Sequence, residues 1–218
     1  MRKIEKQREP AALSQWRAAN AGTPNCSYRH LSSEAHQAVK GSLIEEQGSL
    51  CAYTGHRIRA DSCHIEHLKP QAHCIDEETV SYQNIVACYP FSGHPGYGAK
   101  QKDNWPSPSE AARFVSPLSD GCEARFRFDA AGRIAPANAL DTAATETILR
   151  LRLNHSSLEK FRHEAVRPVL ALPLKAARSR LADLDRRSRT LTPFCFAVRQ
   201  MLQRHIRRLE AMRANSSN

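Results

Sequence analysis

The amino-acid sequence predicts an α+β fold, in which short strands in the middle of the chain are embedded in helices. Two observations carry this prediction. Apolar residues recur at helical spacing in residues 32–47 and again through most of the chain after Pro136. Between these regions, residues 49–58 and 123–134 are rich in aromatic and β-branched side chains around glycine-containing turns, which is typical of short strands.

Residues 1–49 are predicted to form an N-terminal arm followed by helices. Residues 11–19 suit a short helix. Residues 32–47 begin with two serines, which commonly cap helix N-termini, and the segment keeps a helical pattern despite Gly41. Gly48 is expected to end this helix.

Residues 50–135 are assigned to a central domain that holds the strands. The segment SLCAYTGHRI is typical of a strand pair or a knuckle, and SCHIEHL is expected to be a strand that ends before Pro70. After a loop at residues 71–80, YQNIVACYP continues as an ordered apolar segment. AKQKDNW is then expected to open a short helix, and EARFRFDAAGRI to form a β-hairpin.

Residues 136–218 are predicted to form a basic α-helical region. The chain has a net charge of +10, and residues 150–218 hold 16 Lys and Arg against 5 Asp and Glu, whereas residues 1–149 hold 16 against 17. A localised basic surface is typical of proteins that bind nucleic acid. A solubilising helix face or an acidic protein partner would leave the same pattern.

The segment VRQMLQRHIRRLE near the C-terminus is amphipathic. Its apolar residues recur at helical spacing: Val198, Met201, Leu202, Ile206 and Leu209. On the largely opposite face we expect phosphate contacts from Arg204, Arg207 and Arg208. The apolar stripe must pack either on the central domain or on a second protein.

The cysteines and the N-terminus indicate a reducing compartment. The seven cysteines are scattered and include no CxxC pair, because Thr54 stands where a CxxC knuckle beginning at Cys51 would have its second thiol. This argues against a four-thiolate zinc cage. The N-terminus lacks the apolar stretch of a signal peptide, and no run is long enough to span a bilayer. We therefore expect a cytoplasmic protein without membrane contact.

The segment SCHIEHLKP gathers His64, Glu66 and His67 before Pro70. In a strand, His64 and Glu66 share one face and His67 points away, so the strand must twist or bulge at its end for His67 to join Glu66. An imidazole can deprotonate water, and a carboxylate can hold a hard cation, which together suit phosphodiester hydrolysis.

Other roles for these side chains fit the sequence as well. His64 and His67 could be ordinary polar histidines. They could also form a structural zinc site with one of three thiols: Cys51, Cys63 or Cys88.

An ordered series of motifs resembles a known family. EHLKP resembles the DHIxP core of HNH endonucleases, NIVACYP their middle segment, and GAKQKDNW their closing segment. With MRKIEK, LCAYTG and EARFRFDAAGRI, the series is similar to the HNH nuclease subunit of Septu-type and retron-associated antiphage defence systems, from residue 1 to roughly residue 155.

The resemblance implies a small ββα-metal core that cleaves nucleic acid, DNA in preference to RNA, with Mg²⁺ or Mn²⁺ rather than a structural Zn²⁺. It also implies an ABC-type ATPase partner that gates the nuclease. By the same resemblance, His67 would be the general base and Glu66 a metal ligand. Asn84 would orient the base or position its loop, and His64 would be a second ligand or a phosphate contact.

The chain departs from the family pattern at Lys100. Relatives often have GAH where this chain has Gly98-Ala99-Lys100, and an ammonium group cannot coordinate a cation. Either His94 or Asn104 takes the third ligand position, or Lys100 contacts the scissile phosphate, or the metal site is weakened. We assign His94 as the third ligand, and Lys100 and Lys102 as nucleic-acid contacts. The rival interpretation is a non-catalytic nucleic-acid-binding or partner-binding module with a structural zinc or a decayed nuclease site.

Overall fold

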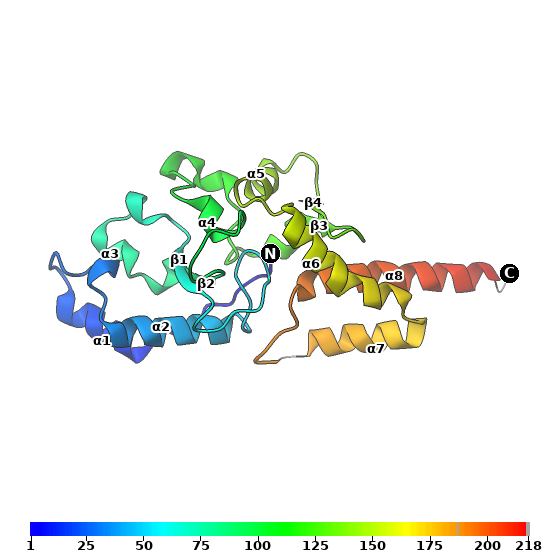
Figure 1. Ribbon diagram of the computed structural model, residues 1–218, viewed down its shortest axis with the longest axis horizontal. Helices are drawn as coiled ribbons and strands as arrows, with labels where there is room; N and C mark the ends of the chain where they lie inside the picture. The colour runs from blue at the N-terminus through cyan, green and yellow to red at the C-terminus, as the bar shows by residue number, and fades with distance from the viewer. Residues whose placement is uncertain (187, 217–218) are drawn as a thin grey trace.

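Two antiparallel strand pairs lie between N-terminal and C-terminal helices in the computed structural model, which describes residues 1–186 and 188–216 (Figure 1). The predicted α+β class is confirmed. The helices are α1 (Ala11–Asn20), α2 (Ser33–Glu46), α3 (Asp76–Thr79), α4 (Ala99–Lys102), α5 (Thr142–Arg150), α6 (Ser156–Val166), α7 (Leu174–Asp185) and α8 (Cys195–Ser216). The strands are β1 (His64–His67), β2 (Ile85–Cys88), β3 (Phe126–Phe128) and β4 (Ile134–Pro136).

Helix α2 forms where the capping pattern predicts it. The Ser32 hydroxyl accepts a hydrogen bond from the Ala35 backbone N–H, which satisfies one donor of the first turn. Three buried apolar residues recur every four positions along its inner face: Ala35, Val39 and Leu43. Gly48 lies just beyond the helix with φ of +62°, and a Cβ there would lie 2.5 Å from the Leu191 side chain, so glycine is required.

Strands β1 and β2 pair in a continuous antiparallel register, from His64 opposite Cys88 to His67 opposite Ile85. The ladder ends just before Pro70, which lacks the N–H that would continue it. The preceding segment, 49–58, contributes a single isolated bridge between Leu50 and Arg57. It is therefore a knuckle rather than a pair of strands.

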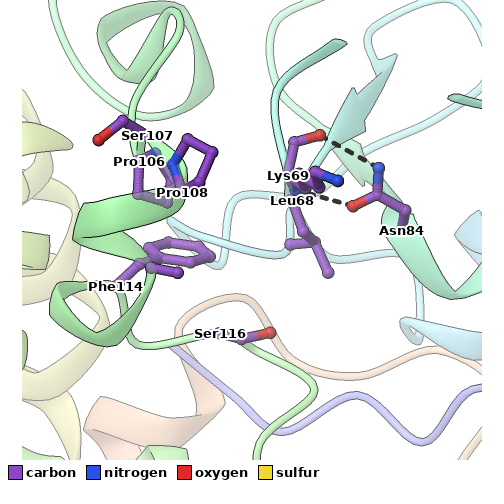
Figure 2. Close-up of a pocket in the computed structure, with 9 residues that line it drawn as sticks. Leu68, Lys69, Asn84, Pro106, Ser107, Pro108, Phe114 and Ser116 are labelled. Carbon is purple, nitrogen blue, oxygen red and sulfur yellow. Dashed lines mark hydrogen bonds between the residues drawn. The ribbon is translucent and has the colours of Figure 1, made fainter. Parts of the chain in front are cut away.

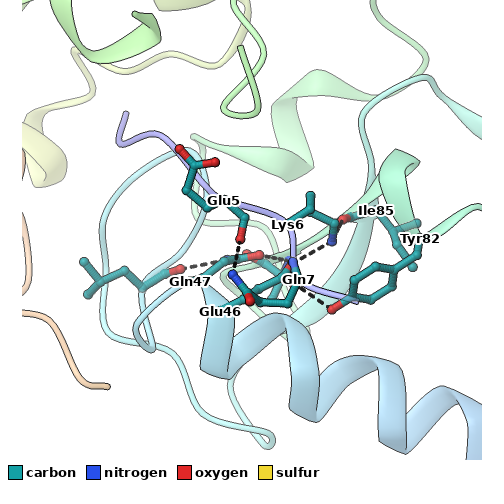
Figure 3. A network of polar contacts seen from close by, with 9 residues as sticks. Glu5, Lys6, Gln7, Glu46, Gln47, Tyr82 and Ile85 are labelled. Carbon is teal, nitrogen blue, oxygen red and sulfur yellow. Dashed lines mark hydrogen bonds and ion pairs between the residues drawn. The ribbon is translucent and has the colours of Figure 1, made fainter. Parts of the chain in front are cut away.

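Side chains, rather than a third strand, occupy the outer edge of β2. The Gln47 amide donates to the Ala87 carbonyl at 2.8 Å and accepts from the Ala87 N–H at 2.7 Å. The Lys6 ammonium donates to the Ile85 carbonyl at 3.1 Å (Figure 3). These contacts satisfy backbone groups that an open edge would expose, and they fasten the N-terminal arm and the end of α2 to the strand pair.

The β3–β4 hairpin connects the central strands to the C-terminal helices. Phe126 and Phe128 are buried and Arg127 between them is exposed, as the alternation of a strand requires. The hairpin packs on α5 and α8, and the Gln200 amide of α8 bonds to backbone groups of both phenylalanines. The buried apolar residues form one continuous core that runs from the N-terminal arm to α8.

Helix α8 runs to one end of the molecule with α7 alongside it (Figure 1). Four residues of its predicted apolar stripe are buried and the fifth packs partly buried against the core: Val198, Met201, Leu202, Ile206 and Leu209. Contacts with α6, α7 and β3 cover this face, so the chain itself buries the stripe. In the described residues, no helix has the length and apolar character needed to cross a membrane.

Candidate functional site

The side chains of His64 and Glu66 lie on the same face of β1, as the strand alternation predicts. Burial alternates along the strand, with His64 and Glu66 partly exposed and Ile65 and His67 buried. The His64 Nε2 atom lies 3.6 Å from Glu66 Oε2. The two polar groups therefore meet at the surface of the strand, while their neighbours face the core.

A backbone contact determines which nitrogen of His64 faces Glu66. The His64 Nδ1 atom lies 2.5 Å from the Pro90 carbonyl oxygen, and because a carbonyl can only accept, Nδ1 carries the proton. In the neutral ring, Nε2 then presents a lone pair toward the lone pairs of the carboxylate. Two acceptors that face each other in this way are arranged to hold a cation or a proton between them.

Lys102, at the end of α4, binds the other oxygen of Glu66. Its ammonium lies 3.2 Å from Glu66 Oε1 and donates to the His67 carbonyl at 2.8 Å. Lys102 is only 1% exposed. The expectation that Lys102 contacts nucleic acid is therefore corrected: its charge is directed inward, and it fixes Glu66 with one oxygen bound and the other facing His64.

His67 lies on the opposite face of β1 from Glu66. The expected bulge at the end of the strand is not found, since the register continues unbroken through His67. The His67 ring packs edge-on against Tyr28 with centroids 4.8 Å apart. Its Nε2 donates to the carbonyl of Thr79, at 2.8 Å, from the one-turn helix α3 that lies in the segment expected to be a loop.

This environment keeps the His67 ring neutral and leaves one nitrogen unused. Burial lowers the pKa of His67, with the Thr79 carbonyl and the Glu66 charge opposing that effect. Because Nε2 carries the proton, Nδ1 holds the lone pair, and it has no hydrogen-bond partner among the described residues. His67 still lines the same groove as Glu66, at the end of the strand.

Asn84 positions a loop and does not contact His67. Its side-chain oxygen accepts from the Lys69 N–H at 2.8 Å, and its amide donates to the Lys69 carbonyl at 3.1 Å (Figure 2). Of the two roles implied by the resemblance, the geometry fits the positioning of the loop after β1. Beyond this pair lies a largely apolar pocket, whose lining includes Leu68, Pro106 and Phe114 (Figure 2).

Of the three residues considered for the third ligand position, two line the groove beside β1 and His94 does not. His94 is exposed in the loop after β2, where its ring contacts the Gly96 N–H and the Gln101 amide rather than Glu66. Lys100 and Asn104 both line the groove beside β1. The complete lining of that groove is His64, Ile65, Glu66, His67, Pro70, Gln71, Lys100, Lys102, Asp103 and Asn104.

The donor set fits a partly hydrated divalent cation better than a closed zinc site. In the described residues, no group of three or more His, Cys, Asp or Glu side chains converges to hold a metal. Ligand atoms lie about 2 Å from a first-row or magnesium ion, so two atoms 3.6 Å apart can share one ion. Mg²⁺ is usually held by one or two carboxylates, with waters and substrate phosphates completing its shell, and Glu66 supplies such a ligand, whereas an imidazole such as His64 is more typical of transition-metal ions.

The C-terminal arginines divide into two kinds. The Arg204 guanidinium donates to the Phe128 carbonyl at 2.6 Å, so it fastens α8 to the β3–β4 hairpin. Arg207 and Arg208 are exposed and have no acidic partner among the described residues. All three arginines are exposed, but Arg207 and Arg208 lack, in the described part of the chain, the intramolecular backbone bond that engages Arg204.

Two participants in the site were not identified from the sequence, Tyr28 and Thr79, and Lys102 was singled out as a nucleic-acid contact rather than as the partner of Glu66. Thr79 acts through its carbonyl, which every residue has, so no residue-type signal marks it. No known protein family and no curated protein matches this chain.

Proposed function

We propose that this chain is a metal-dependent endonuclease of the HNH type. The observation that carries the proposal is the His64–Glu66 pair, in which an imidazole nitrogen and a carboxylate oxygen face each other at 3.6 Å on the solvent side of β1. The antiparallel β1–β2 pair followed by the short helix α4 is compatible with the ββα order implied by the sequence resemblance.

In this proposal the residues of the groove have three roles: binding the cation, orienting its ligands and attracting the phosphate backbone. His64 and Glu66 would hold one divalent cation, which when bound would stabilise negative charge on the phosphate oxygens. Pro90 orients the ring by a hydrogen bond from His64 Nδ1, and Lys102 orients the carboxylate by an ion pair. Lys100 lines the groove and supplies positive charge for the phosphate backbone.

We assign the general base to His67. Its neutral ring and its Nδ1 lone pair suit proton removal from water, and the Thr79 carbonyl stabilises the imidazolium that forms. Because the ring lies behind the strand face that bears Glu66, the attacking water must approach from the end of β1. From the sequence we expected His67 and Glu66 to lie side by side on one face of the strand. Because they lie on opposite faces, the proposed mechanism instead brings the water to His67 from the end of β1.

A plasmid-cleavage assay with Mg²⁺ or Mn²⁺, with and without EDTA, tests the proposal. His67→Ala should lower cleavage by about 10²–10⁴-fold, the usual contribution of a general base, while DNA binding is retained. Wild-type cleavage by purified His67→Ala would remove His67 from the mechanism. Absence of any metal-stimulated cleavage by the wild-type chain, alone and with its partner, would contradict the nuclease assignment.

A second candidate is a binding module with a decayed nuclease site. The observation in its favour is Lys102, whose ammonium neutralises Glu66 from within the fold. The same cleavage assay separates the two functions, because the decayed site would bind nucleic acid with equal affinity in Mg²⁺ and in EDTA and would leave the plasmid intact.

The partner is proposed from the sequence resemblance alone. An ABC-type ATPase of the same defence system would gate the nuclease, and the two should co-purify when expressed together. Independent migration on size exclusion would count against this assignment. The intramolecular burial of the α8 stripe means that the stripe itself does not require such a partner.

A further inference from the structure

Lys40, on α2, has a largely covered side chain and no anionic partner among the described residues. The residue is 9% exposed, and its ammonium has neither a carboxylate nor a hydrogen-bond acceptor among the described residues. The ammonium is nevertheless not among the fully buried polar atoms, so the aliphatic stem is covered while the charged end reaches solvent. Lys40 therefore offers a positive charge that no acidic group of the described residues neutralises.

Among the described residues, the Lys40 ammonium contacts an exposed aromatic ring. Its Nζ lies over the ring of Phe91, 4.7 Å from the centroid, which is within cation–π range. Phe91 is 56% exposed, in contrast to the aromatic residues of the core. One face of the ring is therefore occupied by Lys40, and much of the remaining ring surface is open to solvent.

Lys40 and Phe91 adjoin the His64 end of the candidate site. Phe91 directly follows Pro90, whose carbonyl binds the His64 ring. On the other side, burial raises the pKa of Cys63, and the Lys40 ammonium opposes that shift, which puts Lys40 within electrostatic reach of the residue before His64. A strand of nucleic acid that crosses His64 and Glu66 would pass next to this pair.

We propose that Phe91 and Lys40 form a subsite for one unpaired nucleotide next to the cleaved phosphodiester. The base stacks on the exposed face of Phe91, and the Lys40 ammonium donates to a phosphate oxygen of the same strand. An aromatic platform with a nearby cation is the usual recognition unit for single strands, and a base still paired in a duplex cannot reach such a platform. The subsite rests on the proposed function and adds to it a preference for single-stranded, frayed or flipped substrate.

Fluorescence anisotropy with a labelled oligothymidine single strand and a blunt duplex, both in EDTA to prevent cleavage, tests the subsite. Phe91→Ala should weaken single-strand binding by about 5- to 150-fold, the range for loss of one stacked base, and should affect the duplex much less. Phe91→Trp should restore binding. Leu149→Ala, which removes an equally exposed apolar side chain from α5, should change nothing.

Lys40→Met provides an independent test. Replacing Lys40, whose stem is covered and whose ammonium has no acidic partner among the described residues, with an apolar side chain of similar length should leave the unfolding midpoint nearly unchanged. The same change should lower the salt dependence of single-strand binding by about 0.7 in slope, the value for one lost phosphate contact. Lys160→Met, at an exposed position on α6, serves as the control.

The outcomes separate the subsite from the nuclease. If the wild-type chain cleaves DNA but Phe91→Ala and Lys40→Met bind single strands as it does, the subsite is overturned and the nuclease stands. If the wild type binds single strands in a Phe91-dependent way without cleaving them, the subsite stands and the nuclease fails. If the wild type binds no nucleic acid, both are overturned.

Discussion

Two buried lysine–glutamate pairs in this protein have the same chemistry and different surroundings. Lys6 and Glu46 join the N-terminal arm to the end of α2, with side chains 6% and 1% exposed and an Nζ–Oε1 distance of 2.6 Å (Figure 3). The second carboxylate oxygen accepts from the Tyr82 hydroxyl and the Gln7 N–H, both at 3.0 Å. Lys6 also lies over the Tyr82 ring, 3.6 Å from its centroid.

The pair formed by Lys102 and Glu66 is left incomplete. Lys102 binds one oxygen of Glu66, but the other oxygen has, in the part of the chain that the structure describes, only the His64 ring, at 3.6 Å, beyond the length of a normal hydrogen bond. Glu66 is also more exposed than Glu46, at 15% against 1%. A closed pair with every acceptor satisfied serves the fold, whereas a pair with an unused oxygen facing a groove is available to a ligand.

The comparison predicts its largest effect on stability at Lys6. Lys6→Met should destabilise the protein by about 3–5 kcal/mol, because it leaves Glu46 buried and charged without its partner. Lys102→Met should cost less than half as much, since water can reach Glu66. Urea denaturation of both variants gives the two values, and equal losses would show that both pairs are structural.

The Lys6–Glu46 pair should matter more for stability, whereas the Lys102–Glu66 pair should matter more for activity. Substitution of the two glutamates tests the second expectation. Glu66→Gln should reduce cleavage by about 10²–10³-fold, the usual loss when one preorganised electrostatic group is removed. Its stability should fall by less than the full cost of about 3–5 kcal/mol for breaking a buried ion pair, because the amide oxygen can still accept from Lys102, although that ammonium, 1% exposed, loses its anionic partner. Glu46→Gln is the matched control, and we expect it to lower the unfolding midpoint while the folded fraction keeps its specific activity.

The pH dependence of stability tests whether His67 is a neutral, buried ring. Burial lowers the pKa of His67, so the unfolded state binds more protons at this residue than the folded state does. The stability that the neutral His67 ring contributes is therefore lost as the pH falls below about 6.5. His56, whose pKa burial lowers to about 4, acts in the same direction. His67→Asn should therefore show a shallower loss of stability between about pH 6.5 and pH 5 than the wild type. An unchanged slope would mean that His67 titrates normally.

The smallest predicted effects concern the exposed arginines, which extend the comparison to the C-terminal helices. Arg207→Ala and Arg208→Ala should each reduce the salt slope of duplex binding by about 0.9 and leave stability unchanged. Arg204→Ala should lower stability and leave the salt slope unchanged, because the Arg204 guanidinium donates a hydrogen bond to the Phe128 carbonyl. A shift in the salt slope for Arg204→Ala alone would place the nucleic-acid surface on a different face of α8.

Local sequence patterns predicted most of the elements around the site. The serine cap placed α2, the β-prone run before Pro70 placed β1, and strand alternation put His64 and Glu66 on one face. The bulge at the end of β1 was wrongly expected, because it was inferred from the chemistry that His67 should perform. The backbone instead followed its regular ladder with β2.

The sequence by itself determined which chemical groups lie on the solvent side of β1, since alternation along a strand is a local property of the backbone. Only the tertiary structure decided that Lys102 turns inward, that the Thr79 carbonyl selects the protonated nitrogen of His67, and that the Lys40 ammonium lies over the Phe91 ring. These contacts join residues between 12 and 51 positions apart in the chain. Burial and partner choice at such separations depend on how the elements pack, which no local pattern encodes.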